Sequence, residues 1–264
     1  MNQMIRGIDI SKWQGDFNWS RALKLDGIEF AILKIGGGDC GLYKDSKFDK
    51  NYETCKRLNI PVGCYFYSCA MSMEDAKKEL EYFKKLLKGH VFEYPVFLDV
   101  EGKMLKSKKR LLTDIIKYIL DGLEKDGWYV GIYGSWDNLP AHTFDIELRK
   151  YDHWIAKYSE GIPMLSSGNK VCMWQSGFRK IAGQEVDFNY SYVDYPQVIS
   201  KAGLNGLNKK KELVKYRWYR VRTSWNNPTS QIGAYEILEN AINSCPRGYK
   251  VFDNGGCVIY ENNK

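Results

Sequence analysis

The sequence has few of the residues that bind metals or cross membranes. It contains three histidines, His90, His142 and His153, and no C-x-x-C pair, so the usual clustering of zinc ligands is absent. The longest apolar runs, such as residues 30–35, have the length of strands, well short of the roughly 20 residues of a membrane-spanning helix. We therefore expect no metal, no other cofactor and no membrane-spanning segment.

The chain also lacks the features of exported proteins. Residues 1–16 have no charged region, apolar stretch or small-residue cleavage site typical of a secretory signal. The seven cysteines are an odd number at irregular spacings, which argues against a disulfide framework. We expect a protein without a signal peptide that starts in a cytoplasm.

Charge of one sign gathers at the C-terminal end. The 264 residues carry a net charge of +7, and residues 205–264 contribute ten Lys and Arg against five acidic residues, a net +5. The first 204 residues therefore carry only +2. This asymmetry predicts a separate module attracted to a polyanion, which could be nucleic acid, an anionic membrane or an acidic wall polymer. A basic surface that only aids solubility is the alternative.

Short apolar runs alternate with amphipathic stretches of helical spacing. Strands that are apolar along most of their length and separated by helices are typical of a parallel sheet covered on both faces. The strands are expected at residues 7–10, 30–35, 61–67, 95–100, 129–133, 153–158, 171–175 and 185–188. The helices are expected at residues 19–25, 48–58, 72–87 and 107–126. We predict an α/β fold, an eight-stranded β/α (TIM-like) barrel, irregular in its second half because connections such as 159–170 are short.

A change of pattern near residue 202 predicts three parts. Residues 1–201 form the barrel, residues 202–212 form a linker rich in glycine and lysine, and residues 213–264 form a small α+β module. In that module we expect the order β-α-β-β. Its elements are a strand at 216–223, a helix at 231–244 and a hairpin of residues 249–253 and 257–260 around residues 254–256.

Acidic residues lie at the ends of several predicted strands. Asp99 and Glu101 close one strand, where alternate residues point to the same face about 6.6 Å apart. Active sites of β/α barrels form at this end of the strands. Two carboxylates at this short separation raise one another's pKa, which makes one of them a proton donor near neutral pH. Asp9 on the first strand and Asp187 on the last add further carboxylates.

Aromatic and amide side chains accompany these acids. Flat rings stack on the C–H faces of sugars, while carboxylates and amides bond to hydroxyl and N-acetyl groups. The residues concerned are Trp13, Tyr65, Tyr67, Tyr133, Trp154, Tyr158, Trp174 and Gln175. A barrel mouth with these acids and aromatic rings, and without a Gly-rich phosphate loop, favours a glycan site. For each aromatic residue, packing in the hydrophobic core is the alternative.

Eight short motifs occur in order between residues 5 and 195. They are Gly-Ile-Asp9-Ile-Ser-Lys-Trp13-Gln14, Phe30-Ala-Ile-Leu-Lys34, Gly63-Cys-Tyr65, Pro-Val-Phe-Leu-Asp99-Val-Glu101, Gly131-Ile-Tyr133, Trp154-Ile-Ala156-Lys-Tyr158, Trp174-Gln175 and Val186-Asp187-Phe-Asn189. As a set they resemble glycoside hydrolase family 25, the phage and bacterial lysozymes that cleave peptidoglycan. One departure is Phe66, where the family often has His.

The resemblance implies an N-acetylmuramidase that hydrolyses the β-1,4 bond between N-acetylmuramic acid and N-acetylglucosamine. It implies that Glu101 is the general acid/base and that Asp99 orients and stabilises the 2-acetamido group of the substrate. Asp9 and Asp187 match supporting carboxylates, and Lys34 matches a substrate-binding position. A separation of about 6.6 Å lies within the range of inverting enzymes, but substrate-assisted enzymes need no protein nucleophile, so the stereochemistry stays open.

The tail resembles, more loosely, the C-terminal modules of clostridial phage endolysins over residues 219–260. This likeness implies attachment to the cell wall and self-association into a homo-oligomer through the same module. Its positive charge suits teichoic acids or other anionic wall polymers, and Trp218, Tyr219 and Trp225 are expected to stack on sugars. A basic structural appendage is the alternative.

Three functional hypotheses follow. The first is a phage endolysin that waits in the host cytoplasm, then digests the peptidoglycan of the bacterial wall and lyses the cell. The second is a catalytically inactive peptidoglycan-binding lectin, and the presence of all four acids argues against it. The third is a nucleic-acid-binding protein, but an acidic mouth repels phosphate and no nucleic-acid motif is present. We expect neither a nucleic-acid nor a membrane partner.

Overall fold

The computed structural model describes residues 4–165, 168–207, 218–253, 256 and 258–263. The chain divides into two compact units, residues 1–207 and 208–264. Each unit has a hydrophobic core of its own. Among these described residues, no helix combines the length and the apolar character needed to cross a membrane.

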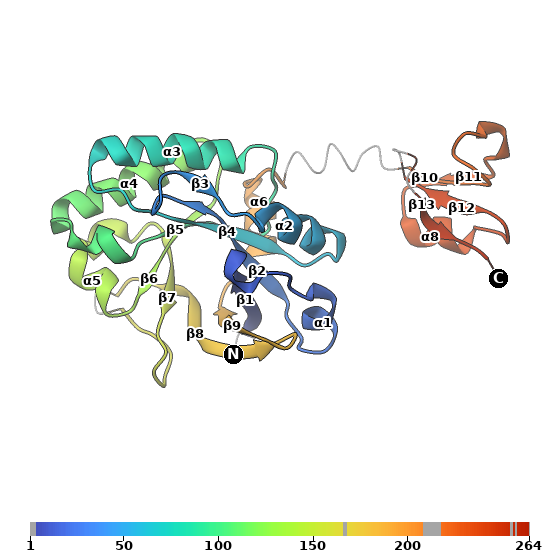
Figure 1. The fold of residues 1–264 in the computed structure, drawn as a ribbon. Helices are drawn as coiled ribbons and strands as arrows, with labels where there is room; N and C mark the ends of the chain where they lie inside the picture. Colours follow the sequence, from blue (N-terminus) through green and yellow to red (C-terminus); the bar gives the residue numbers. More distant parts are fainter. Residues whose placement is uncertain (1–3, 166–167, 208–217, 254–255, 257, 264) are drawn as a thin grey trace. The chain divides into compact units, whose positions relative to one another are not determined.

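The first unit is a closed barrel of eight strands with a ninth strand at its margin (Figure 1). The strands are β1 (Ile5–Ile10), β2 (Phe30–Gly37), β3 (Tyr43–Lys44), β4 (Val62–Tyr67), β5 (Val96–Asp99), β6 (Val130–Ser135), β7 (Asp152–Ala156), β8 (Val171–Ile181) and β9 (Gln184–Ser191). Around the barrel the order is β1, β2, β4, β5, β6, β7, β8 and β9, which returns to β1. The predicted eight-stranded barrel is confirmed, and the short β3, which was not predicted, pairs antiparallel with the end of β2.

Helices cover the outside of the first half of the barrel. The helices of this unit are α1 (Trp19–Lys24), α2 (Phe48–Arg57), α3 (Met73–Leu87), α4 (Lys109–Lys125), α5 (Asn138–His142) and α6 (Tyr195–Ala202), with the 3-10 helices η1 (Lys12–Gln14), η2 (Gly102–Lys106) and η3 (Asp145–Leu148). The four helices predicted from periodicity are α1 to α4. Helices α3 and α4 lie side by side on the barrel (Figure 1). The second half is irregular, as expected, because only α5 and η3 join β6 to β7.

The expectation of a wholly parallel sheet is wrong for the last strand. Strand β9 runs antiparallel to both β8 and β1. Only Ala182 and Gly183 separate β8 from β9, and both have positive φ (51° and 88°), as in the two-residue turns of tight hairpins. Two residues leave no room for a crossover helix, so the strands must be antiparallel.

Alternate strand residues fill the barrel with aromatic rings. Phe30, Phe97 and Trp154 belong to a buried interior cluster, whereas the opposite strand faces pack against the helices. Two glycines make room for these rings, because a Cβ at Gly7 or Gly131 would lie 2.5 Å from the ring of Phe30 or Phe97. Packed rings thus fill much of the interior.

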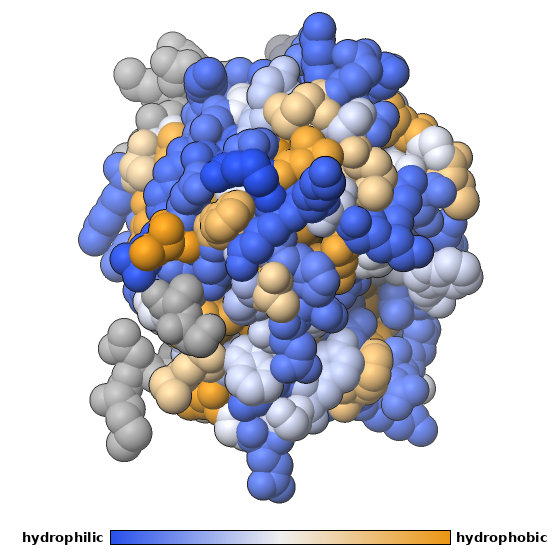
Figure 2. Space-filling view, turned by 90° about the vertical axis from the view of Figure 1, so that its left-hand side faces the viewer, coloured by the Kyte–Doolittle hydropathy of each residue, from blue (hydrophilic) through white to orange (hydrophobic). Residues whose placement is uncertain are grey.

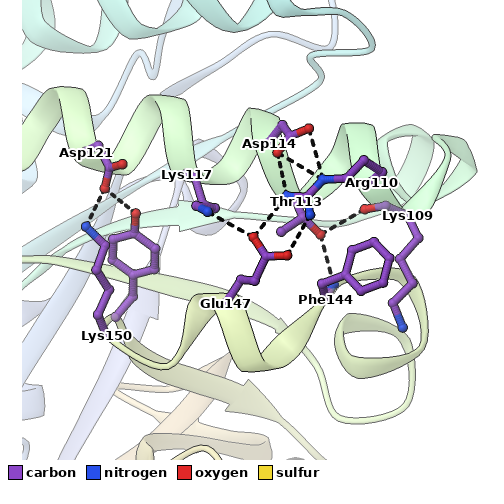
Figure 3. Close-up of polar contacts among 10 residues, drawn as sticks. Lys109, Arg110, Thr113, Asp114, Lys117, Asp121, Phe144, Glu147 and Lys150 are labelled. Carbon is purple, nitrogen blue, oxygen red and sulfur yellow. Dashed lines mark hydrogen bonds and ion pairs between the residues drawn. The ribbon is translucent and has the colours of Figure 1, made fainter.

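An ionic network joins α4 to the connection between β6 and β7 (Figure 3). The Glu147 carboxylate on η3 pairs with Arg110 at 2.6 Å and with Lys117 at 2.9 Å. Nearby, the Phe144 amide donates to the Thr113 hydroxyl at 2.9 Å. Exposed ion pairs contribute little stability singly, but together these contacts fix a connection that lacks a full crossover helix.

The side of the barrel on which α5 lies is mostly hydrophilic. Figure 2 turns this side towards the viewer and shows apolar residues in small, separate patches among hydrophilic ones.

The first part of the predicted linker belongs to the barrel unit. Residues up to 207 pack there, and Asn205 is buried. Its side chain donates to the Tyr94 carbonyl at 2.9 Å and accepts from the Tyr129 amide at 2.6 Å. These bonds satisfy buried backbone groups, which explains why the segment after α6 does not leave the barrel at residue 202. Residues 208–212 of the predicted linker lie outside the described residues.

The second unit is a small antiparallel sheet with one helix. Its elements are β10 (Tyr219–Arg222), η4 (Pro228–Ser230), β11 (Gly233–Tyr235), α8 (Leu238–Asn243), β12 (Lys250–Phe252) and β13 (Val258–Glu261), and the strand order is β11-β10-β12-β13. Its core consists of Val221, Ala241, Cys245 and Val251. The β12–β13 hairpin was predicted, although residues 254, 255 and 257 of its turn lie outside the described residues.

The predicted order β-α-β-β is wrong in one element. The helix expected at 231–244 covers only α8, and β11 occupies the residues before it and pairs with β10. Gly233, which favours helix poorly, lies at the start of this strand. The apolar residues of β11 and α8 together have the spacing of one amphipathic helix, so the sequence pattern alone predicts a single helix.

Candidate active site

Four carboxylates meet at the mouth of the barrel. Asp9 comes from β1, Asp99 ends β5, and Glu101 directly precedes η2. Asp187 lies on β9, where its backbone is the register partner of Asp9. Because directly opposed residues of paired strands are close neighbours, the antiparallel β9 brings Asp187 to the same mouth by register rather than by its strand end.

Asp9 is buried among donors and acids. Its Oδ2 accepts hydrogen bonds from Gln175 Nε2 and Asn189 Nδ2, both at 2.8 Å. Burial, reinforced by the Asp187 carboxylate, raises the pKa of Asp9 from 3.8 to about 8, against the opposing effect of the two amide bonds. Asp9 therefore holds a proton at neutral pH.

Asp99 and Glu101 also have raised pKa values. Burial first, and the Glu101 charge second, raise the pKa of Asp99 well above 3.8. For Glu101, burial and then the Asp187 charge raise the pKa. The Oδ1 atom of Asp99 is buried and has no hydrogen-bond partner among the described residues. A carboxyl group whose pKa is raised in this way is suited to act as a general acid.

One ammonium group offsets this acidity. Lys34 lies on β2, and its Nζ is 4.9 Å from the centroid of the Tyr67 ring and 5.9 Å from that of Tyr65. Its positive charge lowers the pKa of both Asp99 and Glu101. The two tyrosines, predicted as sugar-binding residues, thus pack around Lys34 at the mouth.

Glu101 opens into a pocket of about 370 Å³. The other walls are formed by Tyr133, Ser135, Trp136, Asp137, Ala156, Lys157, Tyr158 and Ser159. Three of these residues are aromatic, and most of the others are polar or charged. Rings beside convergent polar groups suit a sugar, which has an apolar face and a rim of hydroxyls. The arrangement can hold a ring-shaped polyol beside the Glu101 carboxyl, whose pKa is raised.

With this geometry in view, comparison with known proteins identifies the family. The model of the glycosyl hydrolases family 25 matches residues 8–183. The chain belongs to this family. The match contains Asp9, Asp99 and Glu101, whereas Asp187 and Asn189 follow its end, and the register of β9 with β1 places them at the site.

Relatives of family 25 include lysozymes. Lysozyme M1 of Streptomyces globisporus is 26% identical over 188 residues, which cover 62% of this chain and 58% of that protein. The chain therefore spans a little over half the length of this relative. The lysozyme structure from Streptomyces coelicolor has a TM-score of 0.66 at 22% identity over 78% of this chain and 100% of that one. The CTP1L endolysin structure also gives 0.66, at 22% identity over 75% of this chain and 70% of that one.

Two tryptophans of the family 25 barrel that were predicted to bind sugar do not line its mouth. Trp154 is only 1% exposed, and its Nε1 donates to Asn189 Oδ1 at 2.8 Å inside the barrel. Trp174 is the register partner of Ile155, on the outward face of the sheet, and its Nε1 donates to the Lys157 carbonyl at 2.8 Å. Neither ring can stack on a sugar in the mouth, which corrects the prediction for both.

Gln175 supports the site instead of facing the substrate. It is 3% exposed, and its Oε1 accepts from the hydroxyls of Tyr133 at 2.9 Å and Tyr158 at 2.7 Å. Its Nε2 is the donor to Asp9. Because its amide is already committed to these partners, Gln175 positions the two tyrosines and Asp9, a correction to its predicted contact with sugar.

Sequence reasoning missed two residues of the site. Asn189 links Trp154 to Asp9, and the motif around Asp187 contained it without indicating this role. Trp136 follows β6 in a connection that carries no periodic signal. Among the predicted rings, Trp13 on η1 is 80% exposed and Tyr158 is 54% exposed, so both can meet a ligand.

In the second unit the predicted wall-binding residues have different surroundings. Trp225 packs against Phe252 with ring centroids 5.8 Å apart, and the Arg222 guanidinium lies 4.9 Å from its ring. Tyr219 packs partly buried against the small core. Trp218 is 38% exposed.

Proposed function

We propose that this family 25 protein is an N-acetylmuramidase that cleaves the β-1,4 bond between N-acetylmuramic acid and N-acetylglucosamine in peptidoglycan. The observation that carries the proposal is Glu101, a carboxyl with a raised pKa that lines a pocket at the barrel mouth among three further acids. A carboxyl with a raised pKa is suited to protonate the oxygen of the departing sugar.

Asp99 is the second catalytic group of the proposal. It lies two residues before Glu101, is 4% exposed and has a buried oxygen without a partner among the described residues. A polar ligand group is what such an oxygen lacks, and the N-acetyl group of the sugar supplies one. Asp99 thus orients the 2-acetamido group, while Asp9 and Asp187 maintain the charge balance of the mouth.

The proposal is tested by replacing Glu101→Gln, which keeps the shape of the side chain but removes the acid. Release of reducing ends from purified peptidoglycan should fall by about 10²- to 10⁴-fold, the usual contribution of a general acid. Glu53→Gln, an exposed change on α2, is the matched control and should retain full activity. Near-normal release by Glu101→Gln would eliminate this residue as the proton donor.

We further propose that the second unit attaches the enzyme to the wall. Its support is the +5 charge of residues 205–264 and the packing of Arg222 on Trp225. We expect a fusion of the full wild-type chain to a fluorescent protein to bind Gram-positive walls, and the amount bound should fall as the salt concentration rises. Trp225→Ala should bind less while its hydrolysis of soluble glycan fragments is unchanged, and equal binding by both would leave the unit structural.

In a cell we propose that the enzyme is a phage endolysin that leaves the host cytoplasm and lyses the wall. The support is the combination of a peptidoglycan-cleaving barrel with a basic second unit, together with the fold shared with the CTP1L endolysin. Self-association through the second unit belongs to the same proposal. Addition of the purified protein to Gram-positive cells should clear their turbidity, and Glu101→Gln should not.

A further inference from the structure

A second recess borders the pocket of Glu101. This recess, of about 630 Å³, is lined by Trp136, Asp137, Pro140, Ala141, Met164 and Leu165. Trp136 and Asp137 line both cavities. They therefore form a wall common to both cavities, and none of the four carboxylates of the mouth lines the second one.

Two hydrogen bonds hold Trp136 in this common wall. Its backbone amide donates to the Ala156 carbonyl at 2.9 Å, and its Nε1 donates to the Met164 carbonyl at 2.8 Å. The Lys157 ammonium lies 4.8 Å from the ring centroid. The residue is nevertheless 38% exposed. A ring that is fixed before a ligand arrives loses little conformational entropy on binding.

The residue behind Trp136 is fixed as well. Lys157 Nζ donates to the carbonyls of Glu160 and Gly161, both at 3.3 Å. Its own carbonyl accepts the hydrogen bond from Trp174 on β8. Trp174 thus holds the backbone of Lys157, whose ammonium group lies against the Trp136 ring.

The walls of the recess match one class of ligand. Pro140, Ala141 and Leu165 offer C–H surface, while the exposed Asp137 offers a hydrogen-bond acceptor. A pyranose presents the same pair of features, an apolar ring face and a rim of hydroxyls. Because a glycan is linear, a recess that borders the reactive pocket is placed to receive the next sugar of the strand.

Building on the proposed muramidase function, we propose that Trp136 is the stacking platform of a further sugar subsite in this recess. The occupant is an N-acetylhexosamine of the glycan strand, one position beyond the sugar beside Glu101. Trp136 is then a specificity-determining residue that sets the length of glycan the enzyme prefers.

The test compares the wild type with Trp136→Ala on peptide-free peptidoglycan oligosaccharides of increasing length. Trp136→Ala should raise KM on the longer oligosaccharides about tenfold, the cost of losing one strong aromatic contact, with kcat little changed. Trp136→Phe, which keeps a ring but loses the bond to Met164, should stay near the wild-type KM. Ile146→Ala, an exposed change on η3 that lines neither cavity, is the control.

Three outcomes would overturn the subsite. These are an unchanged KM in a folded Trp136→Ala, a fall in kcat at constant KM, and a defect seen only with peptide-bearing strands, which would assign the recess to the stem peptide. Calorimetric binding of the same oligosaccharides to Glu101→Gln, with and without Trp136→Ala, needs no turnover. This binding measurement tests the subsite even if the wild type is not a muramidase. Failure of the muramidase proposal shows separately, as an absence of new reducing ends.

Discussion

Replacing Asp9→Asn should change how the stability of the barrel depends on pH. In the folded protein, burial and Asp187 raise the pKa of Asp9 to about 8, compared with 3.8 in the reference state. Asp9 therefore keeps its proton in the folded state when the unfolded chain has already lost it. The stability contributed by this proton is fully present below pH 3.8 and is lost as pH rises towards 8.

The magnitude follows from one proton per molecule. Between pH 5 and pH 7 the folded state holds almost one proton more than the unfolded state at this site, so stability falls by about 1.4 kcal/mol per pH unit. Asparagine does not titrate, and its oxygen can still accept from Gln175 and Asn189. The unfolding free energy of Asp9→Asn, relative to the wild type, should therefore rise by roughly 2 to 3 kcal/mol across these two pH units.

Urea unfolding at pH 5, 6 and 7, followed by circular dichroism, measures this difference. Any pH-independent cost of the new amide cancels when slopes are compared, and Glu53→Gln should run parallel to the wild type. If the unfolding free energies of Asp9→Asn and the wild type changed with pH at the same slope, the reasoning would be refuted. They would mean that the two amide hydrogen bonds outweigh burial and keep Asp9 ionised in the folded protein.

Two further substitutions probe the mouth and the interior. Lys34→Met removes the charge that lowers the pKa of Asp99 and Glu101, so both pKa values should rise and the pH–rate profile should move to higher pH; an unmoved profile would contradict the electrostatic role of Lys34. Gly131→Val inserts a side chain where a Cβ would lie 2.5 Å from the Phe97 ring, and should cost about 1–3 kcal/mol in thermal or urea unfolding. Wild-type stability would show that the Phe97 ring has another place to go.

Local signals predicted the barrel well because they are strong there. Buried parallel strands are apolar on both faces, so runs such as residues 30–35 and 95–100 are distinctive, and helices α2 to α4 have clear amphipathic periods. The direction of β9 depended on a two-residue turn at Ala182 and Gly183. A pattern of apolar runs does not show whether the connection between two strands contains a helix.

The candidate site was predictable in its acids and less so in its rings. Asp9, Asp99 and Glu101 sit at or near strand ends, where a carboxylate is conspicuous because the preceding residues are apolar. Trp154 was harder to assign, because a strand that is apolar on both faces does not reveal which of its residues point into the barrel. Trp136 lies in a connection, and only the fold shows that its ring borders the pocket of Glu101.

Chemical analysis of the cleavage products tests the central claim most directly. Peptidoglycan digested by the full chain is reduced with borohydride, and mass spectrometry identifies the sugar that carried each new reducing end. Reduced N-acetylmuramic acid should appear with the wild type and Glu53→Gln, and not with Glu101→Gln. New ends on N-acetylglucosamine would make the enzyme a glucosaminidase, and binding without any new ends would make the barrel a peptidoglycan lectin; either result would contradict the account.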